Sequence, residues 1–446
     1  MNVAAPGAAR SITDVGDAWP TLEQVWNTLT LRAGFNTTSV VLGTSLLGVA
    51  AGVVGVFALL RKRSLTADAL SHATLPGIAL AFILVALAGG AGRSVPVLLL
   101  GGAASGILGV LVIQGLIRHT RLTEDAAIGV VLSVFFGAGV VLLSIIQSMR
   151  TGGQGGLRTF IYGQTAAITR QDAVLMGALA LVAIVLAALL FKELTAVCFD
   201  DAFAQVSGFS VGLIDLLMMG LIVMVTIGGM QAVGLILVVA MLIIPPAAAR
   251  FWSERLSVVI VVSALIGGAS GYLGSAVSAL LPRKPAGAVI VLTAGMIFLL
   301  SLLAAPSRGV IAWAARRARL RLRISSEHVL EALFDAEHTR EQLPAARRAL
   351  GLGTSLIVPI LLRARGLAQR EAGRLVLTEA GRREGARISR NHRLWEQYLV
   401  SYAHVAPSHV DWSVDQVEHV LGADQVRELE SALRARGVPV PAGATS

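Results

Sequence analysis

The chain has 446 residues, of which 55% are hydrophobic and 14% are charged, and its mean hydropathy is +0.74. Soluble domains carry about 25% charged residues, so this composition excludes a soluble protein over most of the length. The net charge of +10 comes almost wholly from arginine and fits the basic loops of a membrane protein better than a nucleic-acid-binding surface. The single cysteine, Cys198, leaves no intrachain disulfide and no thiolate zinc cluster.

Apolar runs between residues 38 and 305 predict an all-α polytopic membrane domain of about nine transmembrane helices, because a helix of ~20 apolar residues crosses a bilayer. The runs are Thr38–Leu60, Thr74–Leu87, Val95–Ile117, Ala126–Ile146, Ala173–Leu190, Leu213–Ile227, Ala232–Ala248, Ser257–Leu281 and Ala288–Ala304. Gly228 and Gly229 separate two short runs, so eight or ten spans also fit. Glycine breaks of this kind often mark a transport path.

Basic residues set the expected orientation of these spans. The loops Arg61–Arg63 and Arg118–Arg121 and the run Arg308–Arg323 are expected on the cytoplasmic side. With nine spans, the amino-terminal segment 1–37 then lies outside the cytoplasm and the carboxyl terminus lies inside it. The arginines of the loop Arg150–Arg170 fall on the opposite side and conflict mildly with this orientation.

The second apolar run begins next to a polar string. Residues 68–77 read Asp-Ala-Leu-Ser-His-Ala-Thr-Leu-Pro-Gly, and the four-residue spacing places Asp68 and His72 on one face of a helix. Ionisable residues at the entrance of a membrane helix are costly and are often functional, and a carboxylate beside an imidazole suits divalent Mn, Zn or Fe. The spacing alone equally fits an aspartate that caps a helix and a histidine bonded to the backbone.

This string resembles the zinc/manganese/iron permease family of ABC transporters. Two further strings support the resemblance, which covers about residues 34–305: Glu124-Asp125-Ala-Ala-Ile-Gly129 and Pro245-Pro246-Ala-Ala-Ala-Arg250. The resemblance implies a homodimeric or paired permease, a separate ATPase, an extracytoplasmic metal-binding protein, and a place on the ion path for Asp68 and His72. The chain contains no Gly-x4-Gly-Lys-Ser/Thr phosphate loop, which agrees with ATP hydrolysis on a partner chain.

A short polar segment, Phe199–Gly208, is expected to form a helix between two spans. It resembles the cytoplasmic coupling helix of the same family, which implies that the segment docks on the ATPase. The residues that carry this expectation are Phe199, Asp200, Asp201, Ala202 and Gly208. An ordinary amphipathic connector has a similar composition.

After Arg308 the chain becomes rich in arginine, glutamate and histidine. We expect a membrane domain over residues 38–306, a basic juxtamembrane linker over 307–323 that could touch anionic lipid, and a cytoplasmic domain over 324–446. Ser325 or Ser326 is expected to cap the first helix of that domain. Helices over Leu343–Leu350 and Thr354–Leu362, a hairpin over Gly366–Thr378 and a long helix over 378–403 then complete a winged helix-turn-helix pattern.

Six of the eight histidines lie in this tail, and several have carboxylates at helical spacing. His328 and Glu331 are three residues apart, His392 and Glu396 are four apart, and Asp415, Glu418 and His419 share one helix face. Any one of these clusters alone is commonly a solvated helix face. Together, mixed carboxylate and imidazole ligands favour Mn or Fe over structural zinc.

The strings Leu377–Gly381, His392–Glu396 and Glu418–Leu421 resemble the iron- and manganese-dependent, diphtheria-toxin-repressor type of transcriptional repressor over about residues 326–435. By position, the resemblance implies that the metal ligands are His328, Glu331, His392, Asp415, Glu418 and His419, with Glu396 added in the iron-type variant. Two departures stand out. His328 stands where the manganese type has an acid, and Asp415 stands where the iron type has cysteine.

The position of the DNA-reading helix argues against DNA binding. Residues Thr354–Leu362 are mostly apolar and contain Pro359, whereas a DNA-reading helix needs polar or basic side chains. Packing against another protein surface suits this segment better, although Arg363, Arg365 and Arg370 could contact phosphates.

The sequence therefore predicts a multi-pass protein of the bacterial inner membrane that imports Mn, Zn or Fe ions, with no chemical catalysis of its own. Its tail is expected to sense cytoplasmic metal and to inhibit transport when loaded. One alternative is a permease for iron–siderophore or cobalamin complexes, which would not need Asp68 and His72. A second is a membrane-tethered, metal-dependent DNA-binding regulator.

Overall fold

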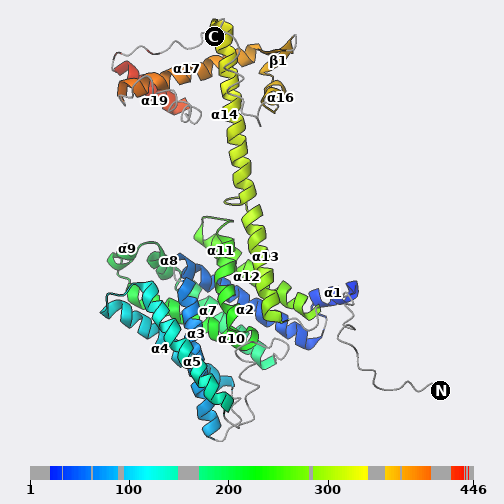
Figure 1. The fold of residues 1–446 in the computed structure, drawn as a ribbon, viewed down its shortest axis with the longest axis vertical. Helices are drawn as coiled ribbons and strands as arrows, with labels where there is room; N and C mark the ends of the chain where they lie inside the picture. The colour runs from blue at the N-terminus through cyan, green and yellow to red at the C-terminus, as the bar shows by residue number, and fades with distance from the viewer. Residues whose placement is uncertain are drawn as a thin grey trace, which may run out of the picture. The chain divides into compact units, whose positions relative to one another are not determined.

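The computed structural model describes residues 21–32, 34–61, 64–88, 95–148, 170–280, 285–339, 357–371, 374–402, 423–435, 437 and 440. The chain divides into two compact units, residues 1–312 and 313–446. The described part is almost entirely helical, with one two-stranded sheet (Figure 1).

The first unit consists of helices only, in the described part of the chain. They are α1 Leu22–Leu29, α2 Phe35–Leu60, α3 Ser64–Leu87, α4 Val95–His119, α5 Glu124–Ser148, α7 Arg170–Leu189, α8 Phe191–Phe199, α9 Asp201–Val206, α10 Val211–Val233, α11 Leu235–Ala249, α12 Leu256–Leu280 and α13 Ala286–Ala304. Eight of the described helices are long and apolar enough to cross a membrane, and the apolar stretch Leu237–Ala249 of α11 is shorter. The predicted polytopic all-α architecture is confirmed, with the shorter α11 at the place of the expected span Ala232–Ala248.

Helix α2 lies among the other membrane helices of this unit. It packs most extensively against α12, and also against α7, α11 and α10. Apolar side chains alternate with small residues along its length, and most of its second half, from Leu47 to Ala58, is buried. Because it is apolar on every face, α2 has the composition of a helix that is surrounded by protein.

Glycines bring α2 into backbone contact with its neighbours. A Cβ at Gly48 would lie 2.2 Å from the carbonyl oxygen of Gly267 in α12, and a Cβ at Gly267 would lie 2.1 Å from that of Gly48. A Cβ at Gly55 would lie 2.1 Å from the Leu242 oxygen of α11, a carbonyl whose usual helical donor is removed by Pro246. These positions accept no larger side chain without movement of the backbone.

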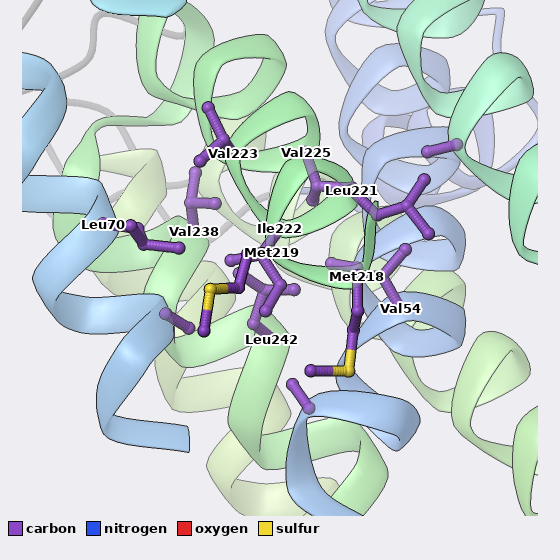
Figure 2. Close-up of a cluster of buried hydrophobic side chains, with 14 of the residues drawn as sticks. Val54, Leu70, Met218, Met219, Leu221, Ile222, Val223, Val225, Val238 and Leu242 are labelled. Atoms are coloured by element: carbon purple, nitrogen blue, oxygen red, sulfur yellow. The ribbon is translucent and has the colours of Figure 1, made fainter. Parts of the chain in front are cut away.

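A large apolar cluster joins α2, α3, α10 and α11, and Figure 2 labels some of its members on these four helices. Helix α10 contributes many of the buried side chains, including Met218, Met219 and Ile222. The unbranched methionines fill irregular space between the helices. The cluster fixes α10 against α3, and this contact positions the polar residues Asp68 and His72 of α3.

Two expectations for this unit were wrong. Helix α3 begins at Ser64 and not at Thr74, so the polar string lies inside it. Gly228 and Gly229 lie within α10, and the chain breaks instead at Gly234, whose φ of 85° favours glycine.

The second unit contains α14, which begins in the first unit, followed by shorter elements. They are α14 Val310–Thr339, α16 Ile357–Ala364, β1 Ala368–Glu371, β2 Arg374–Leu377, α17 Glu379–Tyr402 and α19 Ala423–Ala435. The strands pair antiparallel, with Ala368 opposite Leu377, so the expected hairpin is confirmed. Thr378 caps α17, because its hydroxyl oxygen accepts a hydrogen bond from the Gly381 amide at 3.1 Å.

The beginning of this unit differs from the expectation. The expected linker and the first helix of the tail belong to the single helix α14, so Ser325 and Ser326 are interior residues rather than caps. Helix α16 begins at Ile357, which places Pro359 in its first turn, where proline does not interrupt a helix. The helix expected over 343–350 lies outside the described residues. The division at residue 324 remains a prediction.

The Gly48 contact gives a direct test of the packing. Gly48→Ala should lower the free energy of unfolding by about 1–3 kcal/mol, because the new methyl group overlaps the Gly267 carbonyl. Gly220→Ala is the matched control, because a Cβ there meets nothing within 4 Å. Thermal unfolding of the detergent-solubilised protein measures both. An unchanged midpoint for Gly48→Ala would contradict the packing.

Candidate functional site

Asp68 and His72 lie in the second and third turns of α3, on the same helix face. The His72 Nε2 atom is 3.6 Å from the Asp68 Oδ1 atom. The His72 side chain is 23% exposed and the Asp68 side chain is 39% exposed, so an ion can reach both although both are partly enclosed. The sequence prediction that this string is helical is therefore confirmed, and the pair presents one nitrogen and two carboxylate oxygens within reach of one ion.

The other ring nitrogen of His72 is enclosed. Its Nδ1 atom is buried and has no hydrogen-bond partner among the described residues. The ring meets Phe136 of α5 edge to face, with 5.0 Å between the ring centres. Phe136 limits the rotation of the imidazole, and nothing in the sequence of the α5 run marked it as a neighbour of His72.

Pro76 adds a backbone oxygen to this region. Proline has no N–H, so the carbonyl of His72, four residues before Pro76, lacks the donor that an α-helix normally supplies. Such a carbonyl is a hard oxygen ligand that can complement the side chains of the pair. The proline of the string thus has a physical role beyond the two ionisable residues.

The rest of the string holds α3 against its neighbours. A Cβ at Gly77 would lie 2.0 Å from the Gly101 oxygen of α4, and the Ser105 hydroxyl donates to the Ala73 carbonyl at 2.6 Å. On the side of α10, the hydroxyls of Ser71 and Thr226 lie 3.5 Å apart. The small residues of the string therefore serve close packing around the pair.

The second string of the resemblance occupies a helix start. Glu124 and Asp125 form the first turn of α5, where carboxylates interact favourably with the helix dipole. The Ala126 amide donates to the Thr123 hydroxyl at 3.4 Å. No group of three or more His, Cys, Asp or Glu side chains that could hold a metal ion occurs in the described ranges. Asp68 and His72 thus form a site of few ligands.

The segment Phe199–Gly208 has the expected short helix at its centre. Asp200 caps α9, because its Oδ1 atom accepts hydrogen bonds from the amides of Ala202 and Phe203 at 2.9 and 3.1 Å. Gly208 follows the helix with a φ of 87°, which favours glycine. Three large apolar side chains of the segment are exposed, namely Phe199 at 70%, Phe203 at 64% and Val206 at 89%. An exposed apolar set on a short helix is typical of a docking surface.

Sequence reasoning missed the partner of Arg61. It treated Arg61 only as an orienting cation, yet its guanidinium binds Asp215, a buried acid near the start of α10. An acid inside the apolar run Val211–Val233 is a readable signal, because a buried carboxylate requires a partner.

In the tail, the structure brings together two of the seven predicted ligands. The His392 Nδ1 atom of α17 lies 3.6 Å from the Glu331 Oε1 atom of α14, and both side chains are largely buried. His328 and Glu396 lie one turn away from these two residues, on α14 and α17 respectively, and are half-buried. Asp415, Glu418 and His419 fall outside the described residues. Nitrogen and oxygen donors at this spacing fit a Mn or Fe ion, and the ligand assignment as a whole remains a prediction.

Comparison with known proteins places the membrane unit. Residues 35–305, more than half of the chain, match the ABC 3 transport family. The chain belongs to this family. Residues 378–436 match the metal-binding and dimerisation domain of iron-dependent repressors. Both resemblances drawn from the sequence strings are confirmed, although the repressor match is confined to the part that begins with the cap of α17.

Individual members of the family are similar over most of their length. The manganese transport system membrane protein MntC of Bacillus subtilis (strain 168) is 40% identical over 372 residues, which cover 82% of this chain and 84% of the relative. That alignment is longer than the family match, so it reaches beyond residues 35–305. The zinc transport system membrane protein TroC of Treponema pallidum (strain Nichols) is 44% identical over 66% of this chain and 96% of its own.

A solved structure supports the same architecture. The chain resembles PsaBC from Streptococcus pneumoniae in complex with Fab, with a TM-score of 0.56 and 30% identity over 65% of this chain and 98% of that one. The first unit is thus a membrane permease of the ABC type, and the chain is a transport subunit rather than an enzyme.

The geometry of the pair predicts ion binding by the purified protein. Mn²⁺ at a hundredfold excess over its Kd should add about 2.7 kcal/mol to the free energy of unfolding of the permease. An Asp68→Asn, His72→Gln double variant in a His392→Ala background should lose the stabilisation that remains in the His392→Ala protein alone. Thermal unfolding with Mn²⁺ and with Mg²⁺ makes the comparison, and equal stabilisation of the two proteins would contradict a site at Asp68 and His72.

Proposed function

We propose that this chain is the permease subunit of an ATP-driven importer that carries divalent transition-metal ions, Mn, Zn or Fe, into the bacterial cytoplasm. The observation that supports this most directly is the Asp68–His72 pair, held 3.6 Å apart on a membrane-spanning helix of an ABC 3 family protein. ATP hydrolysis belongs to a separate ATPase, an extracytoplasmic binding protein delivers the ion, and a second permease subunit completes the path.

The chemistry of the pair suits transient binding. A carboxylate and a neutral imidazole bind first-row divalent ions, whereas a full set of protein ligands would hold the ion too tightly for release. The His72 carbonyl and water supply the remaining ligands. Alternating access then exposes this small site to each side of the membrane in turn.

The exposed apolar set of Phe199, Phe203 and Val206 supports the proposal that residues 199–208 dock on the ATPase. A short helix with an ordered cap and exposed aromatic side chains offers a rigid surface for such a contact. The same proposal places this segment in the cytoplasm, and four crossings by α10, α11, α12 and α13 then return the carboxyl-terminal unit to the same side.

A permease for iron–siderophore or cobalamin complexes is the alternative cargo class. Such a ligand is larger than a bare ion and carries its own metal ligands, so it has no need of a carboxylate and an imidazole 3.6 Å apart. Relatives that are named for manganese and zinc transport favour the bare ion.

Uptake of ⁵⁴Mn²⁺ or ⁶⁵Zn²⁺ by cells that express the whole transporter tests the cargo. Asp68→Asn and His72→Gln should each lower uptake at least about tenfold. Loss of a residue that only supports a metal ligand already has an effect of this size, so loss of a ligand should have no smaller one. His119→Gln is the control, because His119 is exposed at the end of α4 and is the other histidine of the first unit. Undiminished metal uptake in both variants would reject the ion path and favour the larger cargo.

We also propose that the tail senses cytoplasmic metal and slows transport when loaded. The pairing of Glu331 with His392 across α14 and α17, on a chain whose cargo is the same class of ion, supports this role. Linkage requires that the ion bind the slow state more tightly than the active one. A DNA-binding role is less well supported, because α16 exposes Ile357 and Ile360, and its exposed polar side chain, Arg363, lies only in the last turn.

Vesicles preloaded with Mn²⁺ test the sensor. Internal Mn²⁺ should lower uptake by the unaltered protein about fivefold or more, and His392→Ala should remove this inhibition without lowering uptake into empty vesicles. Glu337→Gln is the control, because Glu337 lies on α14 as Glu331 does but pairs with Arg382 of α17 instead of His392. Equal inhibition of His392→Ala and the unaltered protein would contradict a regulatory site.

A further inference from the structure

Arg61 joins elements that are far apart in the sequence. It ends α2, and its side chain is only 13% exposed. The Nε and Nη2 atoms donate to the two oxygens of Asp215 in α10 at 3.2 and 2.9 Å, a bidentate arrangement. Nη1 donates to the Val197 carbonyl of α8 at 2.9 Å and to Asp201 of α9 at 2.6 Å.

This geometry matches the properties of arginine and of no other cation. The planar guanidinium presents donors in a fixed fork, so it can grip one carboxylate with two hydrogen bonds while the remaining donors reach other groups. A lysine ammonium is a point charge on a flexible stem and cannot hold Asp215, Val197 and Asp201 in one plane.

The charge state of Arg61 is secure. Burial works to lower the pKa of the guanidinium, but the hydrogen bonds and charges of Asp215 and Asp201 outweigh it, so the pKa is raised above its ordinary value. Asp215 has a side chain that is only 8% exposed, whereas Asp201 is 52% exposed on the segment 199–208. One end of the network is therefore buried between membrane helices and the other end lies on the surface.

Helix α10 extends this connection toward Asp68 and His72. Asp215 and Thr226 are eleven residues apart on α10, which is about 17 Å along a helix. Thr226 lies beside Ser71, the residue before His72, and the Thr74 hydroxyl contacts the sulfur of Met230 at 3.6 Å. A rigid helix thus contacts Arg61 near its start and the surroundings of Asp68 and His72 near its end.

We propose that Arg61 is a positioning residue that fastens the segment 199–208 to α2 and α10. A displacement of the segment by the ATPase then moves the helices around Asp68 and His72. The inference rests on the proposed docking of this segment. Arg61 then transmits a movement in addition to stabilising the fold.

A second set of contacts tightens the same joint. Phe57 of α2 meets Phe191 of α8 edge to face, with 6.4 Å between ring centres. The Cys198 thiol donates to the Phe57 carbonyl at 3.8 Å. These contacts keep α8 on α2 when the network is weakened, so variants of Arg61 and Asp201 are expected to fold.

The test compares coupling with hydrolysis in the complete transporter. The full chain is reconstituted with its ATPase in liposomes, and ATP hydrolysis and ⁵⁴Mn²⁺ uptake are measured on the same preparation. Asp201→Asn and Arg61→Lys should keep the ATPase bound but lower the ions moved per ATP by at least about fivefold. Asp201→Glu, which keeps the carboxylate, should restore part of the ratio.

Two further variants separate this inference from the proposed docking. Phe203→Asp should release the ATPase, because it places a charge on the exposed apolar set. Glu254→Gln is the control. It removes the ion pair between Glu254 and Arg308, whose Oε1 and Nη2 atoms are 2.9 Å apart, and neither residue belongs to the segment 199–208. It should leave both the ATPase and the ratio of ions to ATP unchanged.

The outcomes distinguish the role of Arg61 from the docking of the segment 199–208 on the ATPase. An unchanged ratio in Asp201→Asn and Arg61→Lys, with release of the ATPase by Phe203→Asp, overturns the role of Arg61 and leaves the docking intact. Release of the ATPase by Asp201→Asn itself also overturns it, since Asp201 would then be a docking contact. Retention of the ATPase by Phe203→Asp overturns the docking and with it the inference.

Discussion

The central position of α2 depends on the absence of side chains at a few crossings. Gly48 and Gly267 bring α2 and α12 within backbone contact, and Gly55 brings α2 against the free carbonyl of Leu242 in α11. Lipid tails are as apolar as leucine side chains, so helices in a bilayer are held together by close van der Waals packing rather than by removal from water. Close packing at these glycines fixes α2 and therefore fixes the place where its last turn ends.

Both functional regions of the first unit follow directly from that position. Arg61 stands at the end of α2, and α3 begins three residues later with the string that contains Asp68 and His72. Helix α10 contacts both regions, through Asp215 near its start and through Thr226 farther along. The buried Arg61–Asp215 pair is held by its geometry, and removal of one partner from such a pair typically costs about 3–5 kcal/mol. A stable joint between a surface segment and a membrane helix is what a mechanically driven permease requires.

In the second unit, too, helix packing brings ionisable side chains together, but the packing is made by large apolar side chains instead of glycines. Helices α14 and α17 are polar on one face and bury Val329, Leu330 and Ile388 around the hairpin. Their crossing places Glu331 beside His392, two residues that are 61 positions apart in the chain. Apolar packing between the helices therefore positions a potential ligand pair, in the way that the glycine crossings position α3. Metal ligation in both units would use imidazole and carboxylate, so cargo and regulator would share one ligand preference.

The sequence by itself determined the membrane character, the number of long apolar helices to within one, the hairpin, and the helix face that Asp68 and His72 share. These features depend on local composition and periodicity, which a single chain displays directly. Only the tertiary structure decided that α3 starts ten residues before the expected span, that Phe136 encloses His72, and that Arg61 binds Asp215 and Asp201. Those contacts join residues 64 to 154 positions apart, and no local pattern specifies them. They arise because a buried charge must find a partner wherever the packing of the helices places one.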